Sequence, residues 1–193
     1  MDKEEKFWND KYISKKTGWD IGSVSTPIKE YVDQLTNKSL KILIPGCGNA
    51  WEGEYLLQQN FRNTHLIDLS NEAISKFIER VPDFPANQIY RGDFFKHQEK
   101  YDLIIEQTFL SALHPSMRNE YAKQMSKLLN PGGKLVGVIF GVEMFHDHPP
   151  YGGNITDYKT IFEPYFEFNT FEPATNSIPP RMGNELFLIL EKK

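Results

Sequence analysis

The sequence of 193 residues contains one cysteine, Cys47, so it cannot form an internal disulfide. A chain without disulfides is typical of a reducing compartment, and we therefore expect a cytoplasmic protein. It also lacks an apolar run of about 20 residues that could span a bilayer. The N-terminal stretch MDKEEKFWNDKY is charged where a secretion signal would be apolar. These absences predict a protein without membrane contact.

Basic residues are not in excess either. Lys and Arg number 22 against 26 Asp and Glu, which gives a net charge of −4. Nucleic-acid-binding proteins neutralise phosphates with clustered Lys and Arg, and no long basic run occurs here. We therefore expect a small-molecule substrate and no nucleic-acid partner. The length suits a single domain, residues 1–193, which we expect to be a monomer.

Short apolar runs alternate with amphipathic stretches along most of the chain. Several runs are apolar at consecutive positions, as strands buried on both faces of a sheet must be. The expected strands are residues 40–45, 64–69, 87–92, 101–107 and 134–140, and the expected helices between them are residues 50–59, 71–81 and 115–129. This alternation predicts an α/β fold with a doubly wound parallel sheet.

The two ends of the chain extend this pattern. Two further strand patterns, residues 166–173 and 185–193, are expected to pair as an antiparallel hairpin at the sheet edge. Seven strands with that ending resemble the Rossmann-like class I methyltransferases more than the dinucleotide dehydrogenases. Ahead of this core, residues 38–193, we expect a helical lid over residues 1–37. Its second helix is expected to have Thr26 as N-cap and Pro27 at the first helical position.

A glycine-rich turn, PGCG, follows the first expected strand. In such folds this turn binds an adenosine-containing ligand. Gly46 allows close approach of the ligand, and Gly48 allows the tight turn into the next helix. Asp68 ends the second strand, and its carboxylate can accept hydrogen bonds from both ribose hydroxyls.

Two cofactors compete for this turn. A dinucleotide requires a third small residue for close packing of the helix on the strand, but Trp51 occupies that position. S-adenosylmethionine carries no phosphate and requires only Gly46 and Gly48, so it is the expected cofactor. Cys47 is interpreted as a small, inert, buried residue. No set of residues has metal-ligand spacing, so no metal is expected.

Several motifs together resemble the thiopurine methyltransferase superfamily, and most closely its branch of plant thiol and halide methyltransferases. The resemblance runs nearly end to end and is carried by FWNDKYISKKTGWDIG, PGCG, GDFF, YDLIIEQTFLSALHPSMR, PGG, HPPYGG and IPPRMG. It implies a transfer of a methyl group from S-adenosylmethionine to a small soft nucleophile such as a thiol, a halide or a thiopurine-like sulfur.

The resemblance also implies an aromatic lid. Trp8 and Tyr12 would face the cofactor from the first helix, and Trp19 would cover it further along. The family commonly has Trp at the position of Tyr12. Aromatic faces attract a cationic sulfonium. The alternative is that these aromatics simply pack on the core.

Further cofactor positions follow from the same resemblance. Gly46 and Asp68 match the family's cofactor-binding positions, and Asp93 and Phe94 match those around the adenine. Gln107 matches a cofactor-contacting position at the end of the fourth strand, where relatives carry Tyr or Arg.

The sequence gives less information on the residues that would contact the methyl acceptor. In the resembled branch a Pro-Pro-Tyr lines the acceptor pocket, which makes Tyr151 a candidate unless the prolines merely stiffen a loop. Arg181 is either a partner for an anionic acceptor or a solvated loop residue. A thiolate or halide needs no general base, so no catalytic residue is assigned. An oxygen or nitrogen acceptor would need one, and His146 or Tyr151 would be the candidates. A non-catalytic S-adenosylmethionine-binding domain is the other alternative, and a dehydrogenase comes third.

Overall fold

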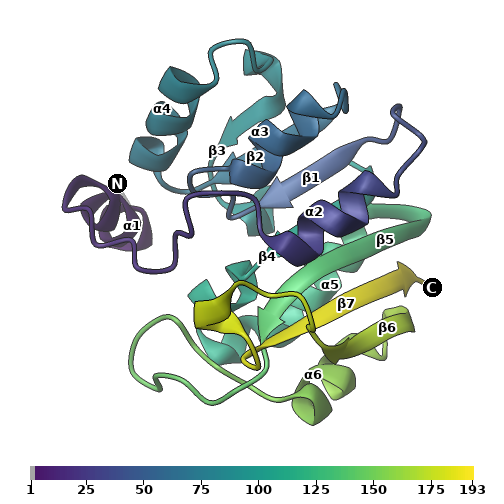
Figure 1. The fold of residues 1–193 in the computed structure, drawn as a ribbon. Helices are drawn as coiled ribbons and strands as arrows, with labels where there is room; N and C mark the ends of the chain where they lie inside the picture. Colours follow the sequence, from purple (N-terminus) through teal and green to yellow (C-terminus); the bar gives the residue numbers. More distant parts are fainter. Residues whose placement is uncertain (1–2) are drawn as a thin grey trace.

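Seven strands form one sheet in the computed structural model, which describes residues 3–193 (Figure 1). Their bounds are β1 Ile42–Pro45, β2 Thr64–Asp68, β3 Ile89–Arg91, β4 Tyr101–Gln107, β5 Leu129–Phe140, β6 Phe166–Pro173 and β7 Glu185–Lys192. Across the sheet the order is β3-β2-β1-β4-β5-β7-β6. Strands β1 to β5 pair in parallel, whereas β7 runs antiparallel to both β5 and β6. The predicted fold class is confirmed, including the antiparallel C-terminal pair with β6 at the edge.

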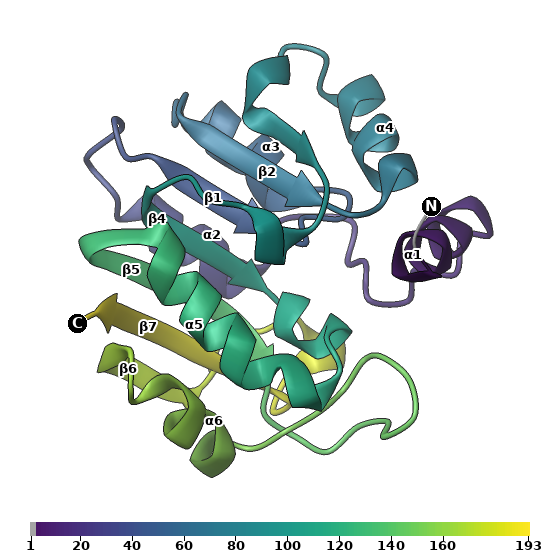
Figure 2. The same cartoon turned by 180° about the vertical axis from the view of Figure 1, so that it is seen from behind.

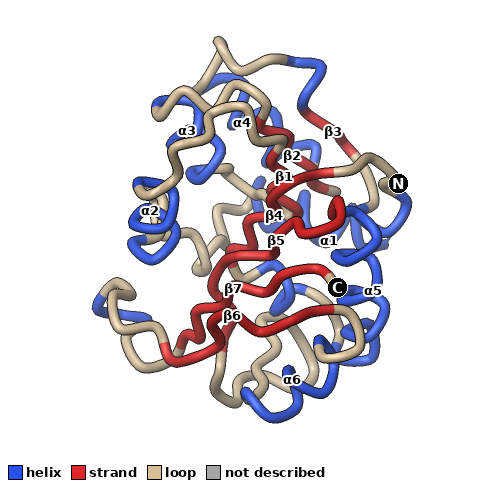
Figure 3. Tube along the Cα trace, turned by 90° about the vertical axis from the view of Figure 1, so that its right-hand side faces the viewer, coloured by secondary structure: helices blue, strands red, loops and turns tan. Residues whose placement is uncertain are grey.

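Helices cover both faces of this sheet. They are α1 Lys3–Ile13, α2 Thr26–Asp33, α3 Trp51–Gln58, α4 Asn71–Arg80, α5 Arg118–Leu128 and α6 Ile155–Phe162. Helices α2, α3 and α4 contribute to one buried core, and α5 and α6 contribute to the other. Figure 2 shows α5 and α6 on the rear face, and Figure 3 shows the strands between the two helical layers. Within residues 3–193, no helix has the length and apolar character needed to cross a bilayer.

The strands explain why the sequence shows continuous apolar runs. Along β1, Ile42 and Ile44 point into the core beneath α2 and α3, whereas Leu43 points into the core beneath α5. Successive side chains of a strand face opposite sides, so both sides must be apolar when both are covered.

The structure differs from the sequence expectation at three places. Helix α6 was not predicted, because eight residues are too short to show a clear helical period; it begins after Asn154, whose side chain accepts a hydrogen bond from the backbone N–H of Asp157. The N-cap of α2 is Ser25, not Thr26. Strand β5 begins at Leu129, not at residue 134, so the PGG segment lies within it, where the pairing with β4 shifts register between Leu129 and Lys134.

A cluster of rings covers the sheet between β3 and β4, where residues 92–100 contain no α-helix. His65 of β2 stacks on Tyr90 of β3 at a centroid distance of 5.9 Å, and His97 stacks on Tyr101 at 5.7 Å. The hydroxyl of Tyr90 donates a hydrogen bond to Glu99 at 2.8 Å. Rings therefore fill the space that a crossover helix would otherwise cover.

The expected lid divides into two different parts. Helix α1 lies beyond the carboxyl ends of the parallel strands, beside α4 (Figure 1). It is held there by Asn9, which accepts a hydrogen bond from the Ser70 hydroxyl at 2.9 Å. Helix α2 instead packs on the sheet through Ile28 and Val32. Only α1 and the linker after it are therefore placed to cover a site; Met1 and Asp2 lie outside the described residues.

Candidate functional site

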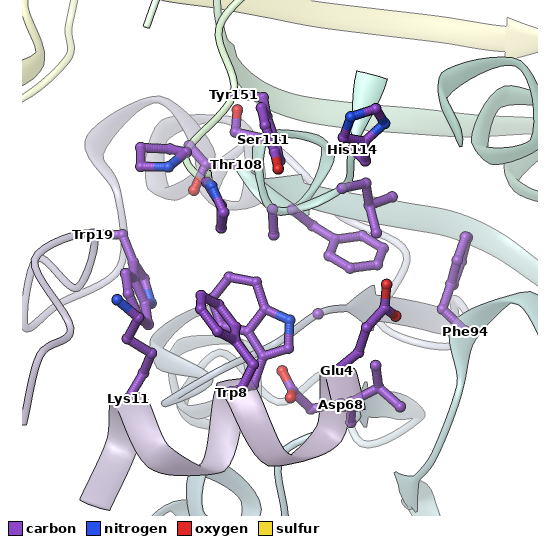
Figure 4. A pocket seen from close by; sticks show the side chains of 18 of the residues that line it. Glu4, Trp8, Lys11, Trp19, Asp68, Phe94, Thr108, Ser111, His114 and Tyr151 are labelled. Atoms are coloured by element: carbon purple, nitrogen blue, oxygen red, sulfur yellow. The ribbon is translucent and has the colours of Figure 1, made fainter. Parts of the chain in front are cut away.

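A cavity of about 430 Å³ lies between α1 and the carboxyl ends of the parallel strands (Figure 4). Most residues that the sequence singled out line it: Trp8, Tyr12, Trp19, Gly46, Asp68, Asp93, Phe94, Gln107 and Tyr151. A smaller cavity of about 70 Å³ shares Tyr12, Trp19, Gly46 and Gln107 with it, and is also lined by Gly48. The fold thus brings residues from six separated stretches of the chain to one place.

The glycine turn has the conformation that requires glycine. Gly46 and Gly48 have φ angles of +56° and +54°, in the left-handed region. A Cβ on residue 46 would lie 2.1 Å from the ring of Phe109, and one on residue 48 would lie 2.5 Å from the hydroxyl oxygen of Tyr12. The two glycines therefore allow aromatic side chains of the site to approach the turn.

Asp68 connects β2 to this turn. Its Oδ2 accepts a hydrogen bond from the backbone N–H of Gly48 at 2.8 Å, and its Oδ1 accepts one from Ser70 at 2.7 Å. Burial raises the pKa of the Asp68 carboxyl, and these two backbone donors oppose the rise. Each carboxylate oxygen retains a further lone pair, so the group can still accept hydrogen bonds from ligand hydroxyls.

The aromatic residues of the N-terminal segment contact one another over the cavity. Trp19 packs edge-to-face against Trp8 at 5.5 Å and against Tyr12 at 5.9 Å between ring centroids. Tyr12 is 4% exposed, whereas Trp8 and Trp19 keep part of their surface open. In Figure 4 the two tryptophans lie across the cavity from Tyr151 and His114. Their faces are suitable for contact with a cation held between the two sides.

Phe94 and Asp93 form another wall. The ring of Phe94 is buried and packs edge-to-face on Phe109 at 5.3 Å. Asp93 caps the short helix that follows by accepting a hydrogen bond from the backbone N–H of Phe95 at 2.9 Å. Its other oxygen lies 3.4 Å from the Lys96 ammonium. This wall offers a flat apolar surface beside one hydrogen-bond acceptor.

Gln107 is held by the N-terminus of α2. The hydroxyl of Ser25 donates a hydrogen bond to Oε1 of Gln107 at 2.6 Å, so this hydroxyl does not cap its own helix. The backbone N–H of Ser25 donates to Glu52 at 3.2 Å. Burial raises the pKa of Glu52 to about 7. With its oxygen engaged by Ser25, Gln107 presents amide N–H donors to a ligand.

The sequence reasoning missed the cavity residues on the segment after β4, which include Phe109, Ser111 and His114. The backbone N–H of Ser116 donates to Nδ1 of His114 at 3.3 Å, so the neutral ring carries its proton on Nε2. His114 packs edge-to-face on Tyr151 at 5.5 Å. Their position directly after a central parallel strand was the available signal, because ligands bind outside the carboxyl ends of such strands.

Two acceptor candidates are placed differently from the expectation. Arg181 is 8% exposed and forms an ion pair with Glu185 at 2.9 Å, so it is not a solvated loop residue. Among the described residues, neither Arg181 nor the exposed His146 belongs to the lining of either cavity. His148 does line the larger one. The Arg181 guanidinium is instead engaged by the protein itself, through the Glu185 carboxylate.

The environment of Cys47 makes its thiol unreactive. It is buried, and burial raises the pKa of its thiol well above the usual value, with Asp68 adding to the rise. A thiol without thiolate character is a poor nucleophile. Nowhere in residues 3–193 do three or more His, Cys, Asp or Glu side chains gather as they would around a metal ion.

Comparison with known proteins agrees with this arrangement. A probable thiol methyltransferase 2 of Arabidopsis thaliana is 28% identical over 184 residues, which cover 92% of this chain and 81% of the plant protein. A thiopurine S-methyltransferase of Vibrio campbellii is 28% identical over 182 residues, covering 84% of this chain and 83% of the bacterial protein.

A solved structure shows the same fold. The 1,6-didemethyltoxoflavin-N1-methyltransferase of Burkholderia thailandensis, with S-adenosylhomocysteine bound, superposes with a TM-score of 0.79 at 13% identity, covering 98% of this chain and 87% of that one. The model of the thiopurine S-methyltransferase family matches residues 3–187. The protein is thus an S-adenosylmethionine-dependent methyltransferase, and its chain belongs to the thiopurine S-methyltransferase family.

Proposed function

We propose that this methyltransferase acts on a small, soft nucleophile: a thiol, a halide or a thiopurine-like sulfur. The observation that carries the proposal is the composition of the larger cavity. Asp68 and the aromatic residues Trp8 and Trp19 lie on one side, and the polar groups of Tyr151 and His114 lie on the other. The relatives named as thiol and thiopurine methyltransferases support the same class of acceptor.

The residues present fit S-adenosylmethionine. Asp68 would accept hydrogen bonds from the ribose hydroxyls, Phe94 would pack on the adenine, and Asp93 would accept from its amine. Trp8 and Trp19 would contact the sulfonium through their ring faces, each contact contributing about 0.5–2 kcal/mol. The cofactor supplies an electrophilic methyl group on that sulfonium. Glu106, buried behind the site, accepts a hydrogen bond from the backbone of Leu110 and so fixes the wall that carries Phe109.

The chain's part in the reaction is alignment and exclusion of water. A thiolate or halide is already nucleophilic, so it needs only a fixed direction of attack and loss of its hydration shell. Tyr151, 8% exposed, donates its hydroxyl proton as a hydrogen bond toward such an anion. His114 cannot accept a proton at Nε2 while Ser116 holds Nδ1, so in this geometry it is a donor and not a base.

The test is direct measurement of methyl transfer. Purified protein is incubated with labelled S-adenosylmethionine and a panel of thiols, bisulfide, iodide and thiopurines, beside alcohols and amines of similar size. We expect labelled product from the soft anionic acceptors. Turnover only with alcohols or amines would contradict the proposed acceptor class, and tight cofactor binding without any product would indicate a binding domain. We further propose that the protein acts as a monomer, and that it works in a reducing cytoplasm, which its single buried cysteine supports.

A further inference from the structure

A buried ion pair joins Arg181, in the loop between β6 and β7, to Glu185, the first residue of β7, and neither residue lines the cavity. Nη1 of Arg181 donates to Oε1 of Glu185 at 2.9 Å, and the hydroxyl of Ser177 donates to Oε2 of the same carboxylate at 2.7 Å. Glu185 is 2% exposed. Burying a guanidinium and a carboxylate is costly unless their hydrogen bonds are satisfied, so the remaining donors of Arg181 matter.

The other partner of Arg181 lies 162 residues away in the sequence. Nη2 of Arg181 donates a hydrogen bond to the backbone carbonyl of Trp19, in the linker between α1 and α2. The next residue, Asp20, accepts hydrogen bonds from the indole N–H of Trp51 at 2.7 Å and from Asn49. The linker is therefore held on one side by the C-terminal loop and on the other by the segment that follows the glycine turn.

Trp19 is the side chain that this fixation positions. It lines both cavities and is the ring against which Trp8 and Tyr12 pack edge-to-face. A change in its backbone would move the centre of this three-ring cluster. On the other side of the cavity, where the methyl acceptor would bind, neither Tyr151 nor His114 is hydrogen-bonded to Arg181.

We propose that Arg181 is a positioning residue for the cofactor side of the site, acting through the carbonyl of Trp19. This rests on the proposed function in one respect, that Trp8 and Trp19 face the methyl donor. Loss of the Arg181 hydrogen bond then weakens binding of S-adenosylmethionine and leaves binding of the acceptor unchanged. An arginine that held an anionic acceptor would give the opposite pattern.

The experiment compares the wild-type protein with Arg181→Met and with Arg181→Met combined with Glu185→Gln, which avoids an unpaired buried carboxylate. Arg62→Met, an exposed arginine, is the control. Calorimetry gives the affinity for S-adenosylhomocysteine, and steady-state kinetics give KM for cofactor and thiol separately. Near-ultraviolet circular dichroism reports the packing of the three tryptophans, Trp8, Trp19 and Trp51, a signal that a purely structural role in the C-terminal loop would not move.

We expect both Arg181 variants to bind S-adenosylhomocysteine about tenfold more weakly, as for loss of one charge-assisted hydrogen bond. KM for the cofactor should rise by a similar factor, KM for the thiol should stay within about twofold, and the tryptophan signal should change. Unchanged cofactor affinity in the folded double variant, or a rise in KM for the thiol alone, overturns the inference. Failure of the wild-type protein to bind S-adenosylhomocysteine would overturn the proposed function itself and this inference with it.

Discussion

The hydroxyl oxygen of Tyr12 lies so close to Gly48 that a Cβ atom on residue 48 would be 2.5 Å from it. Tyr12 belongs to α1, and Gly48 to the turn after β1. The absence of a side chain at residue 48 thus allows the helix over the cavity to reach the turn that would hold the cofactor. Gly48 has two roles, in the backbone of the turn and in the contact with α1.

Gly48→Ala is expected to separate these two roles. The left-handed φ of +54° costs an alanine about 1–2 kcal/mol, and the methyl group displaces the Tyr12 hydroxyl. Adding Tyr12→Phe removes that clash but not the backbone strain. We therefore expect Gly48→Ala to weaken both folding and S-adenosylhomocysteine binding, and the double variant to recover part of the binding only.

The control is Gly132→Ala, because its φ of +72° is also left-handed, a Cβ there would meet no atom within 4 Å, and it lines neither cavity. Urea unfolding and calorimetry measure the two effects. Equal losses in the single and double variants would show that the contact with Tyr12 has no energetic role.

Asp68→Asn is expected to weaken cofactor binding by about 1.5–3 kcal/mol for each charge-assisted hydrogen bond to the ribose. The amide also turns an N–H toward the backbone donors of Gly48 or Ser70, which adds to the loss. Calorimetry with S-adenosylhomocysteine gives the value, and Asp83→Asn on an exposed loop is the control. NAD should bind neither protein, since Trp51 occupies the position of the third small residue. Unchanged affinity of the Asp68 variant would remove this carboxylate from the site.

The sequence predicted the sheet well because the burial of β1, β2, β4 and β5 on both faces leaves an apolar run that no other element produces at that length. The glycine turn and Asp68 were recognisable for a similar reason, since their chemistry is local to strand ends. What was missed depends on tertiary contacts. The bond between Arg181 and Trp19 joins the C-terminal loop to the N-terminal linker, and no local pattern records it.

The sequence also did not show that two of its carboxyl groups are buried. Glu52 and Glu106 stand in segments where a carboxylate would ordinarily be assigned to solvent, yet both are buried and hydrogen-bonded to backbone donors. Composition and periodicity do not distinguish such a residue from a solvated one. Its burial follows only once Ser25 and Leu110 are brought next to it by the fold.

We expect the ring cluster between β3 and β4, which contains His65 and Tyr90, to make the folded state less stable in acid. Burial lowers the pKa of His65 from 6.5 to about 4, so the folded state favours the neutral ring. The contribution of His65 to the free energy of unfolding is complete above pH 6.5 and is lost as the pH falls through about 4. Between these values the free energy of unfolding changes by up to about 1.4 kcal/mol per pH unit. His65→Phe should remove this component of the slope. Urea unfolding at pH 4 to 7 measures it.

Tyr90→Phe is the matched control for that series, because it removes the hydroxyl next to His65 and keeps the imidazole. The part of the pH dependence of stability that comes from His65 should then remain. A pH dependence that is identical in the wild-type protein and in His65→Phe would show that the imidazole is not the group responsible.

Glu106 predicts the opposite dependence on pH. Burial raises its pKa from 4.5 to about 7, although Tyr121 donates a hydrogen bond to it. The folded state therefore holds a proton that the unfolded state has lost, and this stabilisation decreases as the pH rises through about 7. Glu106→Gln keeps the shape without titrating, so its stability relative to the wild-type protein should increase from pH 5 to pH 8 by up to roughly 3 kcal/mol.

Glu99→Gln serves as the control for Glu106, because Lys41 and Tyr90 hold the pKa of Glu99 below its usual value and it does not titrate in this range. Its stability difference from the wild-type protein should stay constant between pH 5 and pH 8. The same flat result for Glu106→Gln would contradict the assignment of a protonated, buried carboxyl group.

The last prediction concerns the acceptor and its ionisation. If no side chain acts as general base, the rate must follow the fraction of acceptor that is already anionic. A series of thiols with different pKa values should then give rate profiles whose midpoints shift with the thiol and not with the enzyme. Tyr151→Phe should raise KM for each thiol, because one hydrogen-bond donor is lost, but should leave these midpoints in place.

The His114→Gln variant completes this experiment, since a glutamine still offers an N–H donor but cannot act as a base near neutral pH. If no general base is needed, the pH–rate profiles of the variant should have the same midpoints as those of the wild-type protein for every thiol. A midpoint that is the same for all thiols and is abolished by His114→Gln would instead identify His114 as a base. In that case Nδ1 would have to carry the ring proton and donate it to the Ser116 hydroxyl, 2.8 Å away, so that Nε2 could accept a proton, and the acceptor class would widen to neutral amines and alcohols.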